Sequence, residues 1–134
     1  MTSSEKRIEL AKYRIKQAEE SLEEAEFLLS GQKSPRSIIN RAYYAMFYSV
    51  LALLVYESYS SSKHSGVIGY FNKRYIKEEV FPEDLGRSIN SAFELRQRGD
   101  YREYFELSYE TVKPYIDKAR TFLTAIRDYL SRKQ

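Results

Sequence analysis

Residues 38–56 read IINRAYYAMFYSVLALLVY, and this stretch decides the fold class. Its clearly polar residues are Asn40, Arg41 and Ser49. The uninterrupted part, residues 42–56, is shorter than the ~18–20 residues that a bilayer crossing requires. Its tyrosines are spread along its length rather than gathered at its ends, which also argues against a membrane span. A helix that is apolar all round packs on several sides, so we expect a central helix with one side available to a second copy of the chain.

The two ends of the chain predict long helices that flank this centre. Thr2 and Glu5 have the spacing of a capping box, and Gly31 is a natural stop. Apolar residues recur in steps of three and four in both terminal segments. The two seams are Ile8, Ala11, Ile15, Ala18, Leu22, Ala25 and Leu29, and Val112, Tyr115, Ala119, Phe122, Ile126 and Tyr129. We expect bundle helices that pack together rather than a coiled coil.

Serine, threonine, proline and glycine positions predict the remaining boundaries. In chain order, Ser34-Pro35 opens the second helix, Ser65 caps a third, Pro82 opens a fourth, Gly99 ends it, and Ser108 or Thr111 caps the last. The last helix tolerates Pro114 only in its first turn. Residues 57–64 are expected to form a loop, and residues 100–107 are ambiguous. Because no linker or repeat is present, we expect residues 1–134 to form one domain, an all-α, up-and-down bundle of four to five helices.

The composition excludes several kinds of chemistry. The 134 residues contain no cysteine, which excludes disulfides, thiolate catalysis and thiolate metal sites. No glycine-rich phosphate loop, nucleophile elbow or pair of metal-binding histidines occurs, so we expect no cofactor and no bound metal. The net charge of +3 is too small to predict a nucleic-acid binder by itself. Residues 1–30 are highly charged, unlike a signal peptide, so we expect a cytoplasmic protein that does not associate with membranes.

Two places hold basic side chains that suggest a role. Arg41 lies at the start of the apolar helix, where it either pairs with a carboxylate or helix carbonyls, or holds an anion in a cleft. Residues 94–102, ELRQRGDYR, carry three arginines, including Arg96 and Arg98, around the predicted end of the fourth helix. These cations either stabilise the negative end of the helix dipole or, beside Tyr101, bind phosphate and stack on bases. The 13 tyrosines are otherwise interpreted as packing residues.

Three blocks in the same order resemble the HEPN superfamily, in particular its small stand-alone prokaryotic members. The blocks are NRAYYAMFYSVLALL (40–54), SSKHSGVIGYF (61–71) and LRQRGDY (95–101). The resemblance covers nearly the whole chain and implies a helical bundle that commonly forms homodimers. It also implies that the protein is one half of a toxin–antitoxin pair whose other half is a minimal nucleotidyltransferase.

The active members of that family are metal-independent ribonucleases. Their motif is an arginine followed, after about four to six residues, by a histidine, which can move protons at an RNA 2′-hydroxyl while the arginine stabilises charge on phosphorus. Here Arg96 matches the motif arginine, but Tyr101 stands where the histidine would fall. A tyrosine with an ordinary pKa of ~10 is a poor proton shuttle at neutral pH. We therefore expect Arg96, Asp100 and Tyr101 to bind a phosphate or nucleotide, or to organise the dimer.

His64 is the only histidine of the chain. At the entrance of the third helix, it is expected to hydrogen-bond the backbone or a tyrosine and to shape that entrance. Two alternatives stay open: an anion nest with Ser65 and Gly66, and catalysis together with Arg96 if the fold brings the two together.

Three functions follow from these residues and from the resemblance. The first is a dimeric module that binds a nucleotide or RNA and interacts with a nucleotidyltransferase-like partner. The second is a divergent metal-independent endoribonuclease that uses Arg96, Asp100 and Tyr101 for catalysis, with or without His64. The third is a scaffold that binds only proteins. The missing motif histidine favours the first.

Overall fold

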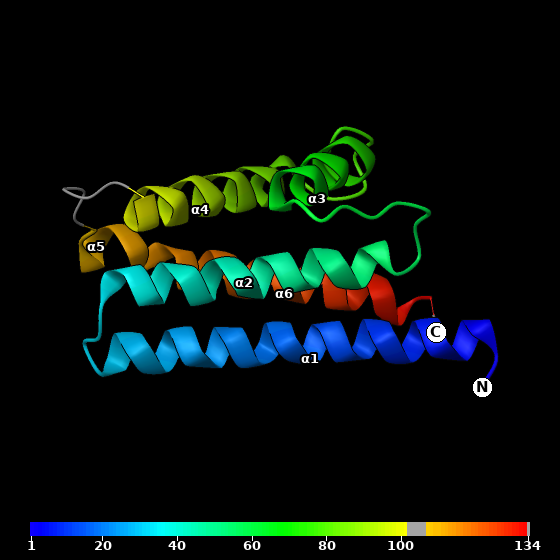
Figure 1. Cartoon of the computed structure of the whole chain (residues 1–134), viewed down its shortest axis with the longest axis horizontal. Helices are drawn as coiled ribbons and strands as arrows, with labels where there is room; N and C mark the ends of the chain where they lie inside the picture. The colour runs from blue at the N-terminus through cyan, green and yellow to red at the C-terminus, as the bar shows by residue number, and fades with distance from the viewer. Residues whose placement is uncertain (102–106, 134) are drawn as a thin grey trace.

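The computed structural model describes residues 1–101 and 107–133, and within these ranges it contains helices and no strand. The elements are α1 (Ser3–Ser30), α2 (Pro35–Leu54), α3 (His64–Phe71), the π-helical turn η1 (Asn72–Ile76), α4 (Glu83–Tyr101), α5 (Tyr109–Val112) and α6 (Pro114–Ser131). The long helices α1, α2, α4 and α6 alternate in direction along the molecule (Figure 1). The predicted all-α, up-and-down bundle is therefore confirmed.

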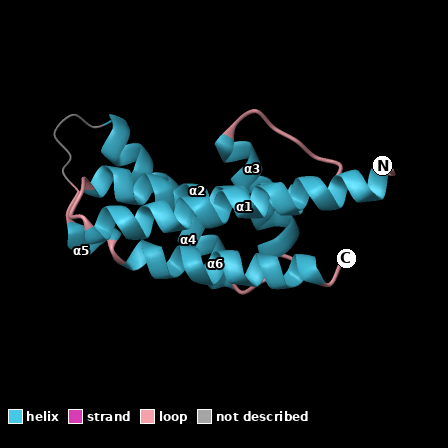
Figure 2. Ribbon diagram, turned by 90° about the horizontal axis from the view of Figure 1, so that it is seen from below, coloured by secondary structure: helices cyan, strands magenta, loops and turns pink. Residues whose placement is uncertain are grey.

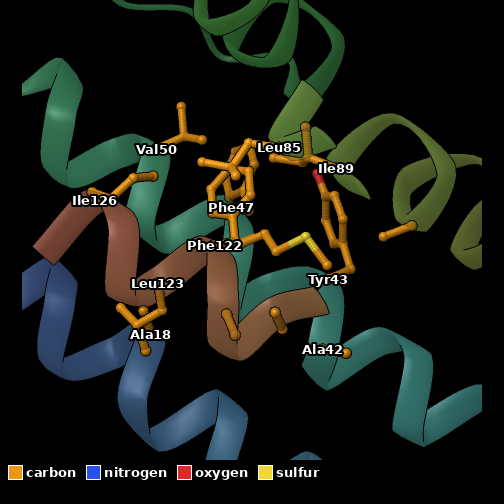
Figure 3. Close-up of a cluster of buried hydrophobic side chains, with 14 of the residues drawn as sticks. Ala18, Ala42, Tyr43, Phe47, Val50, Leu85, Ile89, Phe122, Leu123 and Ile126 are labelled. Atoms are coloured by element: carbon orange, nitrogen blue, oxygen red, sulfur yellow. The ribbon is translucent and has the colours of Figure 1, made fainter. Parts of the chain in front are cut away.

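The centre of the bundle is α2. It packs against α1, α4 and α6, and 12 of its 20 residues are buried. Figure 3 shows part of the buried cluster that these helices share, including Tyr43 and Phe47 from α2 and Phe122 and Ile126 from α6. The helix that is apolar all round is thus packed on several sides, as predicted. Among the described residues, no helix combines the length and apolarity that crossing a bilayer would need.

The seams predicted for the two terminal helices face the core. The buried members are Ala11, Ala18, Leu22 and Ala25 on α1, and Ala119, Phe122 and Ile126 on α6. At the start of α1, Thr2 Oγ1 accepts a 3.1 Å hydrogen bond from the Glu5 backbone amide, so the predicted cap is present. The two helices pack against each other (Figure 2). An ion pair of 2.8 Å joins Glu19 to Arg127.

Two boundaries predicted from single residues are wrong. The helix α4 does not end at Gly99 but continues to Tyr101. A Cβ at Gly99 would lie 2.8 Å from Leu107 Cδ1, so this glycine permits a close approach rather than ending the helix. Ser65 does not cap the third helix either. The N-cap is Lys63, and α3 begins at His64, which places Ser65 in the first turn.

The third and the last of the predicted helices are each interrupted. Ser108 caps only the short α5, where its Oγ accepts a 3.1 Å hydrogen bond from the Thr111 amide. A new helix, α6, then begins at Pro114, which is tolerated because it occupies the first position. The third helix passes from α3 into η1, where the Lys77 amide bonds the Asn72 carbonyl five residues back at 2.8 Å. Apolar spacing alone does not reveal such a widened turn.

Candidate functional site

A surface pocket brings together two residues that lie far apart in the sequence. Its lining comes from the start of α3 and from the second half of α4. The lining residues are Lys63, His64, Ser65, Phe93, Arg96 and Gln97. The fold therefore places His64, the only histidine, in one pocket with Arg96 of the same chain. The sequence had located them in separate segments and left their proximity open.

The imidazole of His64 is held by the aromatic residues of α2. Its ring stacks on that of Phe47, with centroids 4.0 Å apart and planes 15° apart. Its Nδ1 lies 2.7 Å from the hydroxyl oxygen of Tyr43. One expected role of His64, a hydrogen bond to a tyrosine at the helix entrance, is thus present. These contacts fix the position of the ring in the pocket wall.

The hydrogen bond to Tyr43 also determines which imidazole nitrogen carries the proton. Tyr43 is fully buried, and burial raises the pKa of its hydroxyl, so the hydroxyl stays protonated and its proton needs an acceptor. His64 Nδ1 is the partner found for that hydroxyl. We therefore assign Nδ1 as the acceptor, which puts the proton of the neutral ring on Nε2. Burial, and then the positive charge of Arg96, lower the pKa of His64, so the ring is neutral at pH 7.

The guanidinium of Arg96 lies against two aromatic rings of α2. Its Cζ is 5.2 Å from the ring centroid of Tyr43 and 5.3 Å from that of Tyr44. Its Nη2 is 3.5 Å from the Tyr44 hydroxyl oxygen. Contacts of this kind hold a guanidinium in place. Arg96 is thus a positioned cation in the pocket wall.

Arg41 lies against the ring of the same tyrosine. Its Cζ is 5.0 Å from the ring centroid of Tyr44. Its Nε and Nη2 donate hydrogen bonds of 3.1 and 2.8 Å to Asn40 Oδ1, and its Nη1 is 3.7 Å from a carboxylate oxygen of Glu24. The carboxylate partner expected from the sequence is therefore present. Two guanidiniums, from α2 and α4, share the ring of Tyr44.

Of the other candidates from residues 94–102, Arg98 is not among the lining residues of the pocket. Arg98 pairs with Glu94 one turn earlier on the exposed surface of α4. The side chains of Asp100 and Tyr101, and the whole of Arg102, lie outside the described residues. The backbone of Asp100 and Tyr101 forms the last turn of α4.

A hydrogen-bond network on the α2–α3 connection supports the pocket. Glu57 accepts hydrogen bonds of 2.7 Å from the Tyr70 hydroxyl and 2.9 Å from the Tyr75 hydroxyl. The Tyr59 hydroxyl donates a 3.1 Å bond to the carbonyl of Gly66, and the rings of Tyr59 and Tyr70 stack 4.3 Å apart. The connection that leads to Lys63 and His64 is therefore tied to α3 and η1 along its length.

Several of these residues were missed by the sequence analysis. Tyr43, Tyr44 and Phe47 were interpreted as packing residues, and Lys63 was not considered. One signal was present: Tyr43 and Phe47 are one turn apart, and Tyr44 follows Arg41 by three residues, so each pair shares a helix face. That spacing cannot show that α3 and α4 supply the partners.

The chemistry of the pocket suits an anion with several oxygen atoms. Its lining offers a guanidinium, an ammonium, an imidazole N–H, a hydroxyl and an amide, and no carboxylate belongs to the lining residues named above. A forked guanidinium matches the spacing of phosphoryl oxygens, and a neutral N–H donor adds a directed hydrogen bond. Among the described residues, no group of three or more histidine, aspartate or glutamate side chains could hold a metal ion.

Comparison with known proteins gives consistent matches over the helices that carry this pocket. The profile of the HEPN domain matches residues 11–129. The chain is 44% identical over 126 residues to a UPF0332 protein of Thermotoga maritima. That alignment covers 94% of this chain and 92% of the Thermotoga maritima protein. It is 36% identical over 119 residues to a protein of Methanocaldococcus jannaschii named "Putative toxin", covering 89% of this chain and 80% of that protein. A second protein of that organism with the same designation is 33% identical over 118 residues, covering 88% and 81%.

Proposed function

The chain belongs to the HEPN family, and from that premise we propose that it is a toxin-like protein whose Arg96 pocket binds a phosphate group of a nucleotide or RNA. The observation that carries the proposal is that Arg96, His64 and Lys63 line one pocket. Arg96 provides the charge, and the Nε2–H of His64 donates a hydrogen bond that needs no protonation of the ring. Phosphate can then bind at neutral pH without uptake of a proton by the imidazole.

The proposal includes a homodimer that interacts with a nucleotidyltransferase-like protein. Its support is membership in the HEPN family, together with the toxin designation of two relatives. Purification from the native host should recover the chain as a dimer with such a protein bound. Recovery of the chain as a monomer, without a nucleotidyltransferase, would contradict this part.

Phosphate binding can be tested through the single imidazole of the chain. Titration with AMP or a short single-stranded RNA should shift the NMR signals of His64, because no other histidine contributes. Arg96→Gln should abolish the shift, since it removes the charge in the pocket. Arg98→Gln is the matched control: it removes the same charge from the same helix but outside the pocket, and should leave binding unchanged. An unperturbed imidazole at saturating ligand would contradict phosphate binding and favour a protein-binding scaffold.

A divergent endoribonuclease is the second candidate, because the pocket joins His64 to Arg96 within one chain. A general base must accept the 2′-hydroxyl proton, however, and the assigned tautomer has a donor rather than an acceptor at Nε2. Binding therefore ranks above cleavage. Cleavage of RNA in EDTA that is lost in both His64→Ala and Arg96→Ala would support the enzyme, and intact RNA after long incubation with the dimer would exclude it.

A further inference from the structure

The helix α1 carries a charge pattern that does not stabilise the helix itself. Basic residues predominate in its first half and acidic residues in its second. They are Lys6, Arg7, Lys12, Arg14 and Lys16, and then Glu19, Glu20, Glu23, Glu24 and Glu26. The helix dipole favours the opposite order, with carboxylates near the N-terminus and cations near the C-terminus. The order of charges therefore suits an interaction with another molecule better than it suits an isolated helix.

We propose that α1 is the interface of the homodimer, with two copies of the helix lying antiparallel around a two-fold axis at Glu20. This inference rests on the homodimer of the proposed function and goes further by naming the face through which the copies meet. The sequence indicated α2 for that role, but its residues 38–54 are all buried or half-buried. By contrast, α1 packs on α2 and α6 along one outer edge of the bundle and leaves its other face exposed (Figure 1).

The exposed side chains on this face are arranged symmetrically about Glu20. They lie in steps of three, four, four and three residues, the spacing of one helix face, at Tyr13, Lys16, Glu20, Glu24 and Phe27. Tyr13 and Phe27 are each seven residues from Glu20, and Lys16 and Glu24 are each four residues from it. In an antiparallel pair, residues equally far before and after the axis lie opposite each other. Tyr13 then faces Phe27 of the second copy, and Lys16 faces Glu24.

The two aromatic residues provide the apolar contact of the interface. Phe27 is 74% exposed and Tyr13 is 55% exposed, although both side chains are large and apolar. Phe27 lines a surface pocket of about 660 Å³ together with Glu20, Glu23, Glu24 and Leu28. Tyr13 of the second copy enters this pocket, where its ring packs on Phe27 and its hydroxyl can donate to a carboxylate. The two-fold axis repeats the contact ~21 Å away along the helix.

The charges of this face are available to a second copy. Among the described residues, Lys16, Glu20 and Glu23 have no ion-pair partner. The pair of Glu24 with Arg41 is long, at 3.7 Å, and such exposed pairs contribute little to stability. Lys16 of one copy lies opposite Glu23 and Glu24 of the other, and the axis makes this pairing occur twice. Glu20 lies opposite its own copy, so the arrangement also predicts a repulsion at the axis.

The absence of cysteine from the chain allows each contact to be tested by cross-linking. In Glu20→Cys the two thiols lie at the axis, and mild oxidation should link the copies through a disulfide. Tyr13→Cys and Phe27→Cys should each stay unlinked alone and should link when the two variants are mixed. Glu83→Cys, on the exposed start of α4, is the control and should stay unlinked.

Dissociation constants from analytical ultracentrifugation give a second readout. Phe27→Ala should weaken the dimer roughly a hundredfold, because the axis makes the lost contact count twice. Lys16→Glu should weaken it about tenfold, and adding Glu23→Lys should restore the affinity by exchanging the charges of the pair. Glu20→Gln should strengthen the dimer, since it removes the repulsion at the axis. Lys118→Glu, on the exposed surface of α6, should leave the dissociation constant unchanged.

The outcomes separate this interface from the homodimer itself. Every substituted side chain is exposed, so the variants should keep the circular dichroism spectrum of the unmodified chain. A dimer that Phe27→Ala and Lys16→Glu do not weaken, and that Glu20→Cys does not link, would overturn the inference and leave a homodimer formed through another face. A chain that stays monomeric at every concentration would overturn the homodimer as well.

Discussion

Replacing Tyr43 by phenylalanine tests how the imidazole of the pocket is held. The substitution removes the hydroxyl whose oxygen lies 2.7 Å from His64 Nδ1 and leaves the ring in place. That ring is fully buried and stacks on Phe47 with centroids 5.7 Å apart, so no cavity forms and the packing energy is retained. The cost is then that of one hydrogen bond.

A single hydrogen bond of this kind contributes about 1 kcal/mol to the free energy of unfolding. For a chain of this length, Tyr43→Phe should therefore lower Tm by roughly 4 °C. Urea unfolding monitored by circular dichroism measures the free energy directly. A loss above about 3 kcal/mol would show that the substitution disturbs the core, and no loss would show that the hydroxyl is not bonded in the folded chain.

The second readout is the tautomer of His64, measured from its ring nitrogen chemical shifts. The unmodified chain should show one form, with the proton on Nε2. In Tyr43→Phe the two tautomers should mix, because nothing then favours an acceptor at Nδ1. Tyr44→Phe is the matched control: the hydroxyl that it removes lies 3.5 Å from Arg96 Nη2, and Tyr44 meets the imidazole through its ring, which the substitution keeps. An unchanged tautomer in Tyr43→Phe would refute the assignment on which the binding role of His64 rests.

Three further predictions concern stability. Because the folded pKa of His64 lies below 6.5, the unfolded chain binds more protons just below that pH. The free energy of unfolding should fall as pH drops below about 6.5, and the fall should be smaller in His64→Gln, as urea titrations at several pH values would show. Glu57→Gln removes the charge from two tyrosine hydrogen bonds and should lower the free energy of unfolding by about 2 kcal/mol in the same assay. Glu78→Gln, on the exposed surface, is the control and should leave that free energy almost unchanged. Equal losses in the two variants would contradict the prediction. Gly66→Ala would place a Cβ 2.5 Å from Ser61 Oγ, so it should lower the free energy of unfolding by about 1–3 kcal/mol and shift the NMR signals of the His64 imidazole. Unshifted signals would show that the α2–α3 connection accommodates the methyl group without moving the pocket.

The fold could be predicted from the sequence because its determinants are local and periodic. Residues 42–56 are apolar on every face, and that pattern alone requires a helix surrounded by others. The boundaries at Gly99 and Ser65 were wrong because a glycine or serine has several uses that look alike in sequence. Gly99 accommodates Leu107, which comes from beyond the end of α4. The residues next to Gly99 in the sequence do not predict this contact.

The candidate site could be predicted only in part, because its contacts are not local. Arg96 and His64 were both identified, each from its residue type and its own segment. Their meeting depends on how α3 packs beside α4 on the face of α2, which periodicity does not specify. Tyr43 belongs both to the core and to the site, and an apolar pattern shows only the first of these roles.

The pocket is complete only while the small helix α3 is packed against the bundle, because Lys63, His64 and Ser65 at its start line the pocket. It contacts α2 and α4 sparsely, whereas α1, α2 and α6 pack along much of their length. In native-state hydrogen exchange, this eight-residue helix, which contributes Val67, Ile68 and Phe71 to the core, should open at lower free energy than the bundle that carries it. Each such opening carries Lys63 and His64 away from Arg96 while the long helices stay folded. Any change that shifts the population of the opened α3 would therefore change how often the pocket is complete.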